Sequence, residues 1–357
     1  MNTNFTPIWA AEPDYEKFIR KCKDNGVSRI ITTIPPKELA DIANKNNIDV
    51  IAYSAVNVSG DMKKSYIWSL QYMNGDPKTE SGRKILDNHK PIWSNMTTEL
   101  TFSGDRDNFA KNNPQFWTKS QNLISELNPG KRIQLSPGFD EVRSYEANRF
   151  QKAYKSSQSQ GVQLEFVLPN IDEHGNADIG YEDPIRNAFI SEYNQDPINM
   201  KNSDLNWLNF RANYYSELVG DIYKKIKNED PKALVSTTIV AGEENDYVKV
   251  LQDWPTWIEN QYIDEFYLWF RTNSNIQDVE KQTKYASNII QNRCPLIVEL
   301  SCYHPGSFQT KKQIIDAAKA ALDNGANCVG VYQSFAITQL NLWPALSEVS
   351  KLNEKFK

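Results

Sequence analysis

The chain has 357 residues, of which 39% are hydrophobic and 11% aromatic, so it can bury a sizeable core. Its formal net charge is −5, and Lys and Arg are scattered among acidic residues, which excludes the basic face of a nucleic-acid-binding protein. The length fits one elaborated domain, because barrels of roughly 250 residues grow by enlarging their loops. An uncharged polar partner suits this composition best.

Metal and cofactor chemistry find little support in the sequence. The four cysteines include no CxxC pair, which excludes a typical zinc site or disulfide framework. With three histidines in the chain, His174 and His304 are too few to form the ligand set of a metal-dependent barrel hydrolase. The acidic loop IDEHGNADIG misses the EF-hand spacing and is expected to be a solvated turn. We therefore expect neither a metal nor a cofactor.

No apolar run approaches the roughly 18 residues of a membrane span. The opening segment MNTNFTPIW lacks the basic and hydrophobic regions of a signal peptide. Two interpretations remain open at this point: a cytoplasmic protein, or an exported protein whose leader is missing from this sequence.

A recurrent order of helix, glycine and β-rich run organises the chain, which is typical of a parallel sheet wrapped in helices. In KFIRKCKDNGVSRIITTI, Phe18 and Cys22 share one helix face, and Gly26 can take the left-handed cap position before the strand. The same order predicts cap glycines at Gly161, in RFQKAYKSSQSQGVQLEFVL, and at Gly325, in KKQIIDAAKAALDNGANCVGVYQSF.

Five further strands are predicted at PIWAA, IDVIAYSAV, ALVSTTIV, IDEFYLWF and CPLIVELSCY, which makes eight. A helix from Asp204 to about Lys227 carries an apolar stripe that should cover the sheet. The predicted fold class is thus α/β, a (β/α)₈ TIM barrel formed by residues 1–357 as a single catalytic domain.

A segment at about 58–137 interrupts this order after the third strand, and it is rich in Asn, Ser, Gly and Trp. We interpret it as a large loop insertion on the face of the barrel where the strands end, which carries function in such folds. A disordered linker is the alternative, but Trp68, Trp93 and Trp117 favour packing or binding, with Trp68 and Trp93 as candidate sugar platforms.

Two glutamates are predicted to point into the barrel. In GVQLEFVLPN, the apolar residues Leu164 and Phe166 share the face that meets the helices, which directs Glu165 inward. In PLIVELSCYH the same alternation directs Glu299 inward on the seventh strand. Burying a carboxylate is costly unless it is paired or hydrogen-bonded, so each residue needs an explanation.

Glycoside hydrolysis is the functional explanation, because it uses one carboxylic acid to protonate the leaving oxygen and a second carboxylate across the anomeric carbon. A separation of about 5 to 5.5 Å predicts retention, and about 6.5 to 9.5 Å predicts inversion. Retaining barrel glycosidases use the fourth and seventh strands, which favours Glu299 as nucleophile and Glu165 as acid/base. The alternative is that either glutamate forms a salt bridge within the barrel packing.

Aromatic and polar side chains near these strand ends are candidate substrate contacts. In IDEFYLWFRTN, alternation directs Tyr267, Trp269 and Arg271 toward the lumen and rim, where aromatic rings can stack on sugars. Interior space-filling is the alternative for Tyr267 and Trp269. After the seventh strand, Tyr303 and His304 can reach the same site, although an exposed loop position is the alternative for His304.

Four segments together resemble the glycosyl-hydrolase-like barrels related to family 10 glycosidases: LSPGFDEVRSYEANRF, GVQLEF, LNFRANYYSELVGDIYKKIK and LQDWPTWIENQYIDEFYLW. Their order and spacing match over roughly residues 129–343, and the tract from Gln252 through Trp257 to Asp264 is the more specific part. The resemblance implies a TIM barrel acting on a polysaccharide or cell-wall glycan, often outside the cytoplasm of bacteria.

The sequence therefore predicts a glycoside hydrolase that degrades an oligo- or polysaccharide by a retaining mechanism. It predicts no nucleic-acid partner and no membrane span, and it favours export to the periplasm, cell surface or medium. Two alternatives remain: a non-catalytic carbohydrate-binding barrel, and a barrel lyase or isomerase acting on sugars. The sugar, the linkage and the oligomeric state are not encoded in these patterns.

Overall fold

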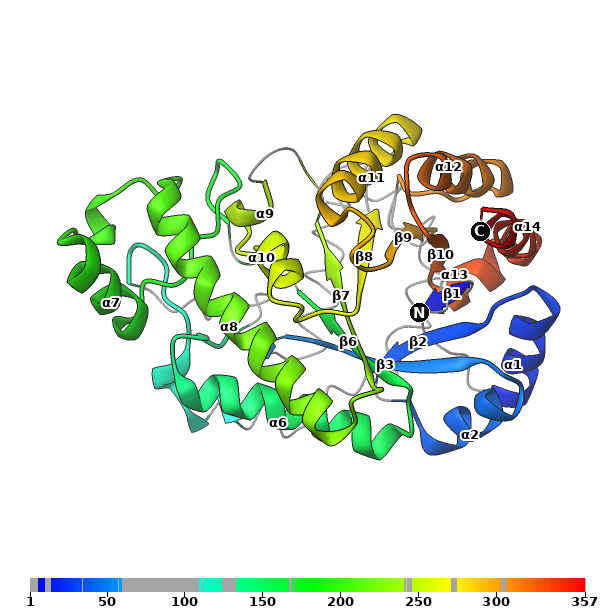
Figure 1. Ribbon diagram of the computed structural model, residues 1–357, viewed down its shortest axis with the longest axis horizontal. Coiled ribbons are helices and arrows are strands. Elements are labelled where there is room, and N and C mark those ends of the chain that lie inside the picture. The colour runs from blue at the N-terminus through cyan, green and yellow to red at the C-terminus, as the bar shows by residue number, and fades with distance from the viewer. Residues whose placement is uncertain are drawn as a thin grey trace, which may run out of the picture.

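The chain folds around a closed barrel of parallel strands with helices on the outside (Figure 1). Eight strands follow one another around the barrel as β1, β2, β3, β6, β7, β8, β9 and β10, and β10 pairs with β1 to close it. The predicted (β/α)₈ TIM barrel is therefore confirmed. The computed structural model describes residues 6–9, 14–33, 35–56, 58–59, 109–110, 112–123, 133–166, 169, 171–240, 242, 246–270, 275–302 and 306–356.

The barrel strands coincide with the segments predicted for them. Between β3 and β6, the short strands β4 (Val58–Ser59) and β5 (Ile133–Gln134) pair antiparallel outside the barrel. Most of the predicted insertion at about 58–137 lies outside the described residues. The barrel strands are β1 Pro7–Trp9, β2 Arg29–Thr33, β3 Asp49–Ala55, β6 Gly161–Glu165, β7 Leu234–Ile239, β8 Glu265–Phe270, β9 Leu296–Ser301 and β10 Cys328–Tyr332.

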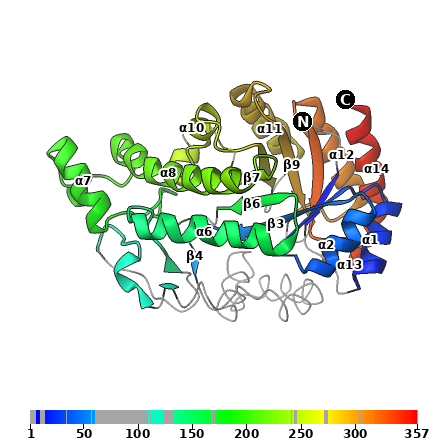
Figure 2. The same ribbon diagram turned by 60° about the horizontal axis from the view of Figure 1, so that its bottom comes forward.

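Helices cover the outside of the sheet. Figures 1 and 2 show α6 and α8 side by side, with α7 at the end of the molecule farthest from α1. The helices are α1 Tyr15–Asp24, α2 Lys37–Lys45, α6 Asp140–Ser157, α7 Asp183–Tyr193, α8 Leu205–Glu229, α9 Asp246–Lys249, α10 Trp254–Glu259, α11 Ile276–Ile290, α12 Lys311–Asp323, α13 Ser334–Gln339 and α14 Trp343–Lys355, with 3-10 turns η1 Pro114–Phe116 and η2 Pro197–Asn199.

Helix α8 has the form predicted from its apolar stripe. Asp204 caps its N-terminus by accepting hydrogen bonds from two backbone N–H groups of the first turn, those of Asn206 and Trp207. The stripe predicted to cover the sheet is buried, namely Leu208, Tyr215, Leu218, Val219, Ile222 and Ile226.

Two of the three predicted cap glycines are confirmed. Gly26 and Gly325 have φ values of +72° and +101°, in the left-handed region that favours glycine. The prediction for Gly161 is wrong, because Gln158 takes the left-handed cap position of α6 at φ 51°. Gly161 instead begins β6, where a Cβ atom would lie 2.1 Å from the carbonyl oxygen of Leu234. Close approach of two strands, and not helix capping, requires this glycine.

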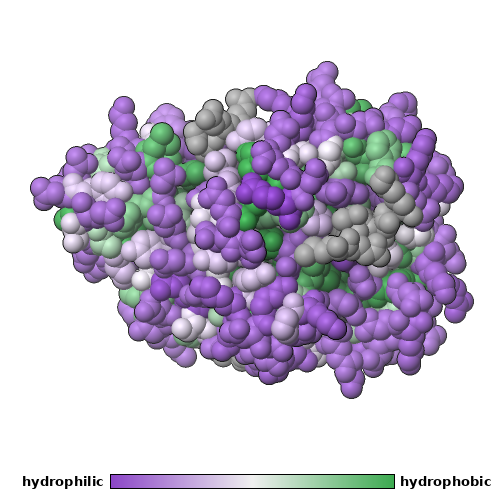
Figure 3. Space-filling view, in the orientation of Figure 1, coloured by the Kyte–Doolittle hydropathy of each residue, from purple (hydrophilic) through white to green (hydrophobic). Residues whose placement is uncertain are grey.

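The face of the molecule seen in Figure 3 is largely polar. In the view of Figure 3, hydrophilic side chains cover most of the helices, with small apolar areas between them. Among the helices in the described part of the chain, none is both long and apolar enough to cross a membrane.

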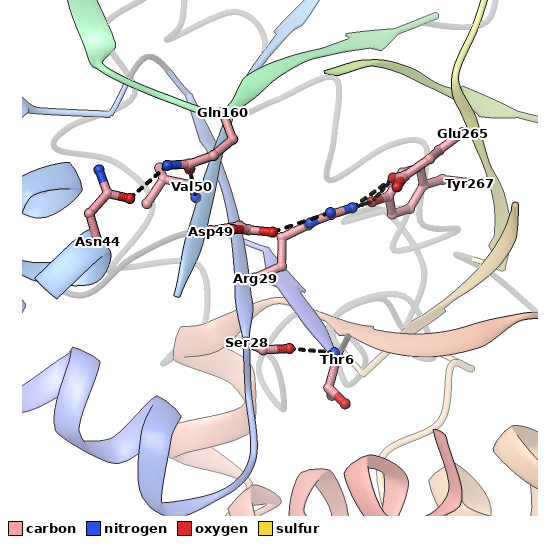
Figure 4. Close-up of polar contacts among 9 residues, drawn as sticks. All are labelled: Thr6, Ser28, Arg29, Asn44, Asp49, Val50, Gln160, Glu265 and Tyr267. Atoms are coloured by element: carbon pink, nitrogen blue, oxygen red, sulfur yellow. Dashed lines mark hydrogen bonds and ion pairs between the residues drawn. The ribbon is translucent and has the colours of Figure 1, made fainter. Parts of the chain in front are cut away.

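A buried polar cluster forms the floor of the barrel, at the N-terminal ends of its strands (Figure 4). The Arg29 guanidinium donates to the Glu265 carboxylate at 2.6 Å and to the Tyr267 hydroxyl at 3.0 Å. It also reaches the Asp49 carboxylate at 3.4 Å. Burial acts to lower the pKa of Arg29, but Tyr267, Glu265 and Asp49 outweigh it and raise that pKa. Arg29 is therefore a fixed positive charge inside the sheet.

The two carboxylates beside Arg29 provide a matched test of this floor. Glu265→Leu leaves the buried guanidinium without its closest acid, and we expect the free energy of unfolding to fall by about 3–5 kcal/mol. The Asp49 side chain is 48% exposed, so Asp49→Ala should cost less than about 1 kcal/mol. Urea unfolding monitored by tryptophan fluorescence measures both values, and equal losses would contradict a floor held by the buried pair.

Candidate functional site

The strand register places Glu299 inside the barrel. On β9 it pairs with Trp269 of β8 on one side and with Gly330 of β10 on the other. Paired residues of parallel strands present their side chains to the same face. Tyr267 faces inward because it reaches Arg29 across the barrel, so Trp269 and Glu299 face inward too. Glu299 is fully buried, and its register partner Gly330 has no side chain.

Glu165 is the last residue of β6 and also faces inward. Its neighbour Phe166 packs outward, with its ring centroid 5.0 Å from that of Trp257 on α10. Glu165 pairs in register with Ala55, the last residue of β3. The Glu165 side chain is partly exposed, in contrast to that of Glu299. The predicted inward orientation of both glutamates thus agrees with the strand register.

The two glutamates lie on the fourth and seventh strands of the barrel, with β7 and β8 between them. Both occupy the C-terminal half of their strands, the face where barrel enzymes carry their active sites. Glu265 belongs to the floor cluster at the opposite end of the barrel. Glu165 and Glu299 lie near the other end and are not part of that cluster. The rim is the candidate functional site.

The side chains predicted to bind substrate have different environments in the structure. Trp269 is partly exposed and in register with Glu299, which suits a sugar platform. Tyr267 is fully buried, and its hydroxyl also donates to Glu265 at 3.1 Å. It belongs to the floor cluster, so the space-filling alternative describes it better than substrate binding. Five further predicted residues lie outside the described residues: Arg271, Tyr303, His304, Trp68 and Trp93.

Trp117, the remaining tryptophan singled out in the insertion, has a packing role. Its indole N–H donates to the carbonyl oxygen of Ala110 at 2.8 Å, and it packs with the buried residues Leu135 and Val142. Packing, one of the two roles predicted for the insertion tryptophans, accounts for this one.

Two aromatic residues near the rim were missed from the sequence. Tyr332 ends β10 in register with Ser301, two positions beyond the pair of Gly330 and Glu299. Tyr53 of β3 is partly exposed and pairs with Gln163, two positions before Glu165. The same alternation that directs Glu299 inward could have identified both, had it been applied to CVGVY and DVIAYSA.

Arg211 anchors the segment that follows β6, at residues 171–182. Its guanidinium is fully buried and donates to the carbonyl oxygens of Ala177 and Ile179, both at 2.7 Å. Gly180 has φ +94°, and a Cβ there would lie 2.7 Å from Arg211 Cδ. Burial lowers the pKa of Arg211 to about 10. The Arg211 guanidinium supplies the hydrogen bonds that the carbonyl groups of Ala177 and Ile179 would otherwise receive from backbone N–H groups of a neighbouring strand.

Glu182 ends the same segment and is buried. Its Oε2 accepts from the backbone N–H of Lys119 at 3.0 Å, which connects the segment to residues 112–123. Its Oε1 has no hydrogen-bond partner among the residues that the structure describes. Burial raises the pKa of the Glu182 carboxyl group, and hydrogen bonds from Ser136 and Lys119 oppose the rise only in part.

This raised pKa predicts a pH-dependent effect of Glu182→Gln. The folded protein keeps the Glu182 proton to higher pH than the unfolded chain does, so this group's contribution to stability falls as pH rises above the ordinary glutamate value. Glutamine has no proton to lose and retains an acceptor for Lys119. We expect the variant's melting temperature to rise relative to wild type between about pH 4 and 7.

The matched control is Glu173→Gln, since the Glu173 side chain is 87% exposed in the same loop. Thermal unfolding by circular dichroism across that pH range measures all three proteins. A pH-independent difference between Glu182→Gln and wild type would contradict the assignment.

The family-specific tract between Gln252 and Asp264 has a structural role. Gln252 Oε1 accepts from the backbone N–H of Val240 at 3.0 Å, at the end of β7. Asp264 accepts from the backbone N–H of Val235 at 2.8 Å and pairs with Lys227 at 2.7 Å, at the start of β7. The tract therefore holds both ends of one barrel strand.

Metal chemistry has no visible site in the described part of the chain, where no three His, Cys, Asp or Glu side chains gather as a ligand set. Asp172, in the acidic loop, accepts from the backbone N–H groups of His174 and Asn176, both at 2.9 Å. Its carboxylate therefore closes a turn, as the sequence predicts.

An eight-stranded barrel with inward glutamates on its fourth and seventh strands has the architecture of a glycosidase-type TIM barrel. The family model described as glycosyl hydrolase-like 10 matches residues 83–312. Because this match covers more than half of the chain, the chain belongs to the glycosyl hydrolase-like 10 family. The resemblance identified from the sequence is confirmed. No match was found among curated protein sequences.

Solved structures of glycosidases share the fold. The chain is similar to the glycoside hydrolase domain of PgaB (BpsB) from Bordetella bronchiseptica, with a TM-score of 0.61, 11% identity, and coverage of 97% of this chain and 98% of that domain. It is also similar to the β-galactosidase of Halorubrum lacusprofundi, with a TM-score of 0.61, 11% identity, and coverage of 99% of this chain and 57% of that chain.

The β-galactosidase of Bacillus circulans sp. alkalophilus gives a TM-score of 0.59 and 9% identity, with 98% of this chain and 55% of that chain covered. The chain thus spans little more than half the length of either β-galactosidase. At these identities the comparison shows the fold, which is that of glycan-acting hydrolases.

Proposed function

We propose that the chain is a retaining glycoside hydrolase that cleaves an oligo- or polysaccharide, with Glu299 as nucleophile and Glu165 as acid/base. The observation that carries this proposal is the pair of inward glutamates at the rim of a barrel of the glycosyl hydrolase-like 10 family. Glycoside hydrolysis needs two carboxyl groups on opposite sides of the anomeric carbon. The fourth and seventh strands supply one each.

In the first step, the Glu299 carboxylate attacks the anomeric carbon while Glu165 donates its proton to the leaving oxygen. A covalent glycosyl-enzyme forms and the glycosidic C–O bond breaks. In the second step, Glu165 takes a proton from water, which displaces Glu299 and releases the sugar with its original configuration. The burial of Glu299 and the partial exposure of Glu165 suit these roles, since only the acid/base exchanges protons with water.

Substrate contacts follow from the same rim. Trp269, beside Glu299, offers an aromatic plane to a sugar ring, and Tyr332 ends the strand on the other side. Arg271, Tyr303, His304, Trp68 and Trp93 remain predicted contacts from the sequence. Export of the protein remains a prediction of the same kind.

The catalytic pair is tested by replacing each glutamate and measuring hydrolysis. We expect Glu165→Gln and Glu299→Gln each to lower kcat/KM by at least about 100-fold, because each removes a carboxyl group used in bond cleavage. Reducing ends released from a panel of polysaccharides and aryl glycosides provide the assay. The exposed Glu173→Gln variant is the control and should match wild type.

Azide separates the two roles. With Glu299→Gly, azide occupies the nucleophile's space and should give a glycosyl azide of inverted configuration, whereas with Glu165→Gly it should give the retained configuration. Full hydrolysis in both glutamine variants would overturn the proposal. Tight glycan binding by wild type without any released reducing ends would establish a non-catalytic carbohydrate-binding barrel instead.

The contrast between two aromatic residues of β8 provides another test. Trp269→Ala removes the proposed platform, and we expect KM to rise about tenfold, which corresponds to roughly 1.4 kcal/mol of binding free energy. Tyr267→Phe removes a hydroxyl group from the floor, and it should lower stability and leave KM unchanged. Steady-state kinetics on one accepted oligosaccharide, with thermal unfolding alongside, measures both. A larger KM effect from Tyr267→Phe would reverse the two assignments.

A further inference from the structure

An arginine of helix α6 contacts the end of the strand next to Glu165. Figure 2 shows α6 running alongside β3 and β6. Arg149 of this helix donates from Nη1 to the Ser54 hydroxyl at 2.7 Å and from Nη2 to the Ala55 carbonyl oxygen at 2.8 Å. Ser54 and Ala55 are the last two residues of β3, and both are buried. Arg149 thus holds the strand end at a side chain and at the backbone.

Glu146 fixes the Arg149 side chain in this position. The two residues lie one helical turn apart, and both carboxylate oxygens are used, with Arg149 Nη2 at 2.5 Å from one and Nε at 3.3 Å from the other. The Glu146 side chain is fully buried, and the Arg149 guanidinium lies 4.5 Å from the centre of the Phe150 ring. A bidentate pair with a buried carboxylate orients an arginine more strictly than a single contact can.

The end of β3 that Arg149 contacts supports Glu165. Ala55 pairs in register with Glu165, and the backbone N–H of Val56 donates to the Glu165 carbonyl oxygen at 2.9 Å. On the other side of β6, the register with β7 ends one residue earlier, at Leu164 and Thr237. The backbone of Glu165 is therefore fastened on the β3 side, at the residues that Arg149 contacts.

We propose that Arg149, oriented by Glu146, is a positioning residue for the acid/base Glu165. Arg149 bonds both the Ser54 side chain and the Ala55 carbonyl group, and so helps to fix the end of β3 and, through the register, the last residue of β6. A shift of about 1 Å in a catalytic group can cost roughly 100-fold in rate, so this support matters for chemistry as well as for folding. The inference rests on the proposed function of Glu165.

The test uses the dependence of rate on the leaving group. An acid/base is needed to expel a poor leaving group such as a sugar alcohol, but hardly needed for dinitrophenolate. We expect Arg149→Met to lower kcat/KM by about 10- to 100-fold on an oligosaccharide and by less than about threefold on the matching dinitrophenyl glycoside. The ratio kcat/KM reports the first step alone. Arg149→Lys keeps the charge and loses the bidentate geometry, so its kcat/KM on the oligosaccharide should lie between those of wild type and Arg149→Met.

Arg143→Met is the matched control, because Arg143 lies on the same helix with 16% exposure against 13% for Arg149. Arg143 is also multiply bonded, to Asp221 at 3.2 Å and to the Pro137 carbonyl oxygen at 2.7 Å, but it contacts α8 and not β3. Its loss should affect both substrates alike. If Arg149→Met does not fold, Ser54→Ala, which removes one of the two strand contacts, carries the same comparison.

Two outcomes overturn the positioning role: equal losses on both substrates, or no loss in a stable Arg149→Met variant. Glu165→Gln is measured alongside to separate this inference from the proposed function. If Glu165→Gln shows the leaving-group dependence and Arg149→Met does not, only the positioning role fails. If Glu165→Gln hydrolyses the oligosaccharide like wild type, the proposed function itself fails.

Discussion

Closure of a parallel eight-stranded sheet ties each inward side chain to partners on both neighbouring strands, and the candidate site depends on this constraint. Glu299 lies between Trp269 and Gly330 because β8, β9 and β10 share one register. A slip of one residue would replace Glu299 by an apolar neighbour and turn its carboxylate toward the helices. Whatever fixes the register therefore also fixes the chemistry of the rim.

The polar groups inside the barrel form two sets, one at the floor and one at the rim. At the floor, the positive charge of Arg29 is matched by Glu265 and Asp49, and the Tyr267 hydroxyl completes the cluster. The Tyr267 hydroxyl bonds to Arg29 at the floor, and Trp269 follows two residues later on β8, nearer the rim. One strand therefore contributes side chains to both ends of the barrel.

Local sequence patterns predict much of the fold and the two glutamates at the centre of the candidate site. Period-two alternation predicted the inward direction of Glu165 and Glu299, and helix-end glycines marked the strands after Gly26 and Gly325. Alternation could not tell that Tyr267 bonds to Arg29, since these residues are 238 positions apart and meet only across the closed barrel.

Gly161 was misjudged for a related reason, because its constraint is the Leu234 backbone on the next strand and not its own helix. Arg149 went unnoticed because its contacts to Ser54 and Ala55 span 95 and 94 positions, and a charged residue on a helix is ordinarily a solvated one. The contacts that a sequence conceals here are those between elements that only the closed sheet brings together.

The unequal burial of the two rim glutamates is consistent with unequal duties. A nucleophile must face the anomeric carbon, and a carboxylate with fewer water neighbours attacks it more readily. An acid/base must give up and recover a proton in each turnover, which requires access to water. Glu299 sits mid-wall between two strands, whereas Glu165 ends its strand and depends on a neighbour for support. The more exposed glutamate is thus the one whose neighbouring strand end, at Ser54 and Ala55, is held by an arginine in a bidentate ion pair.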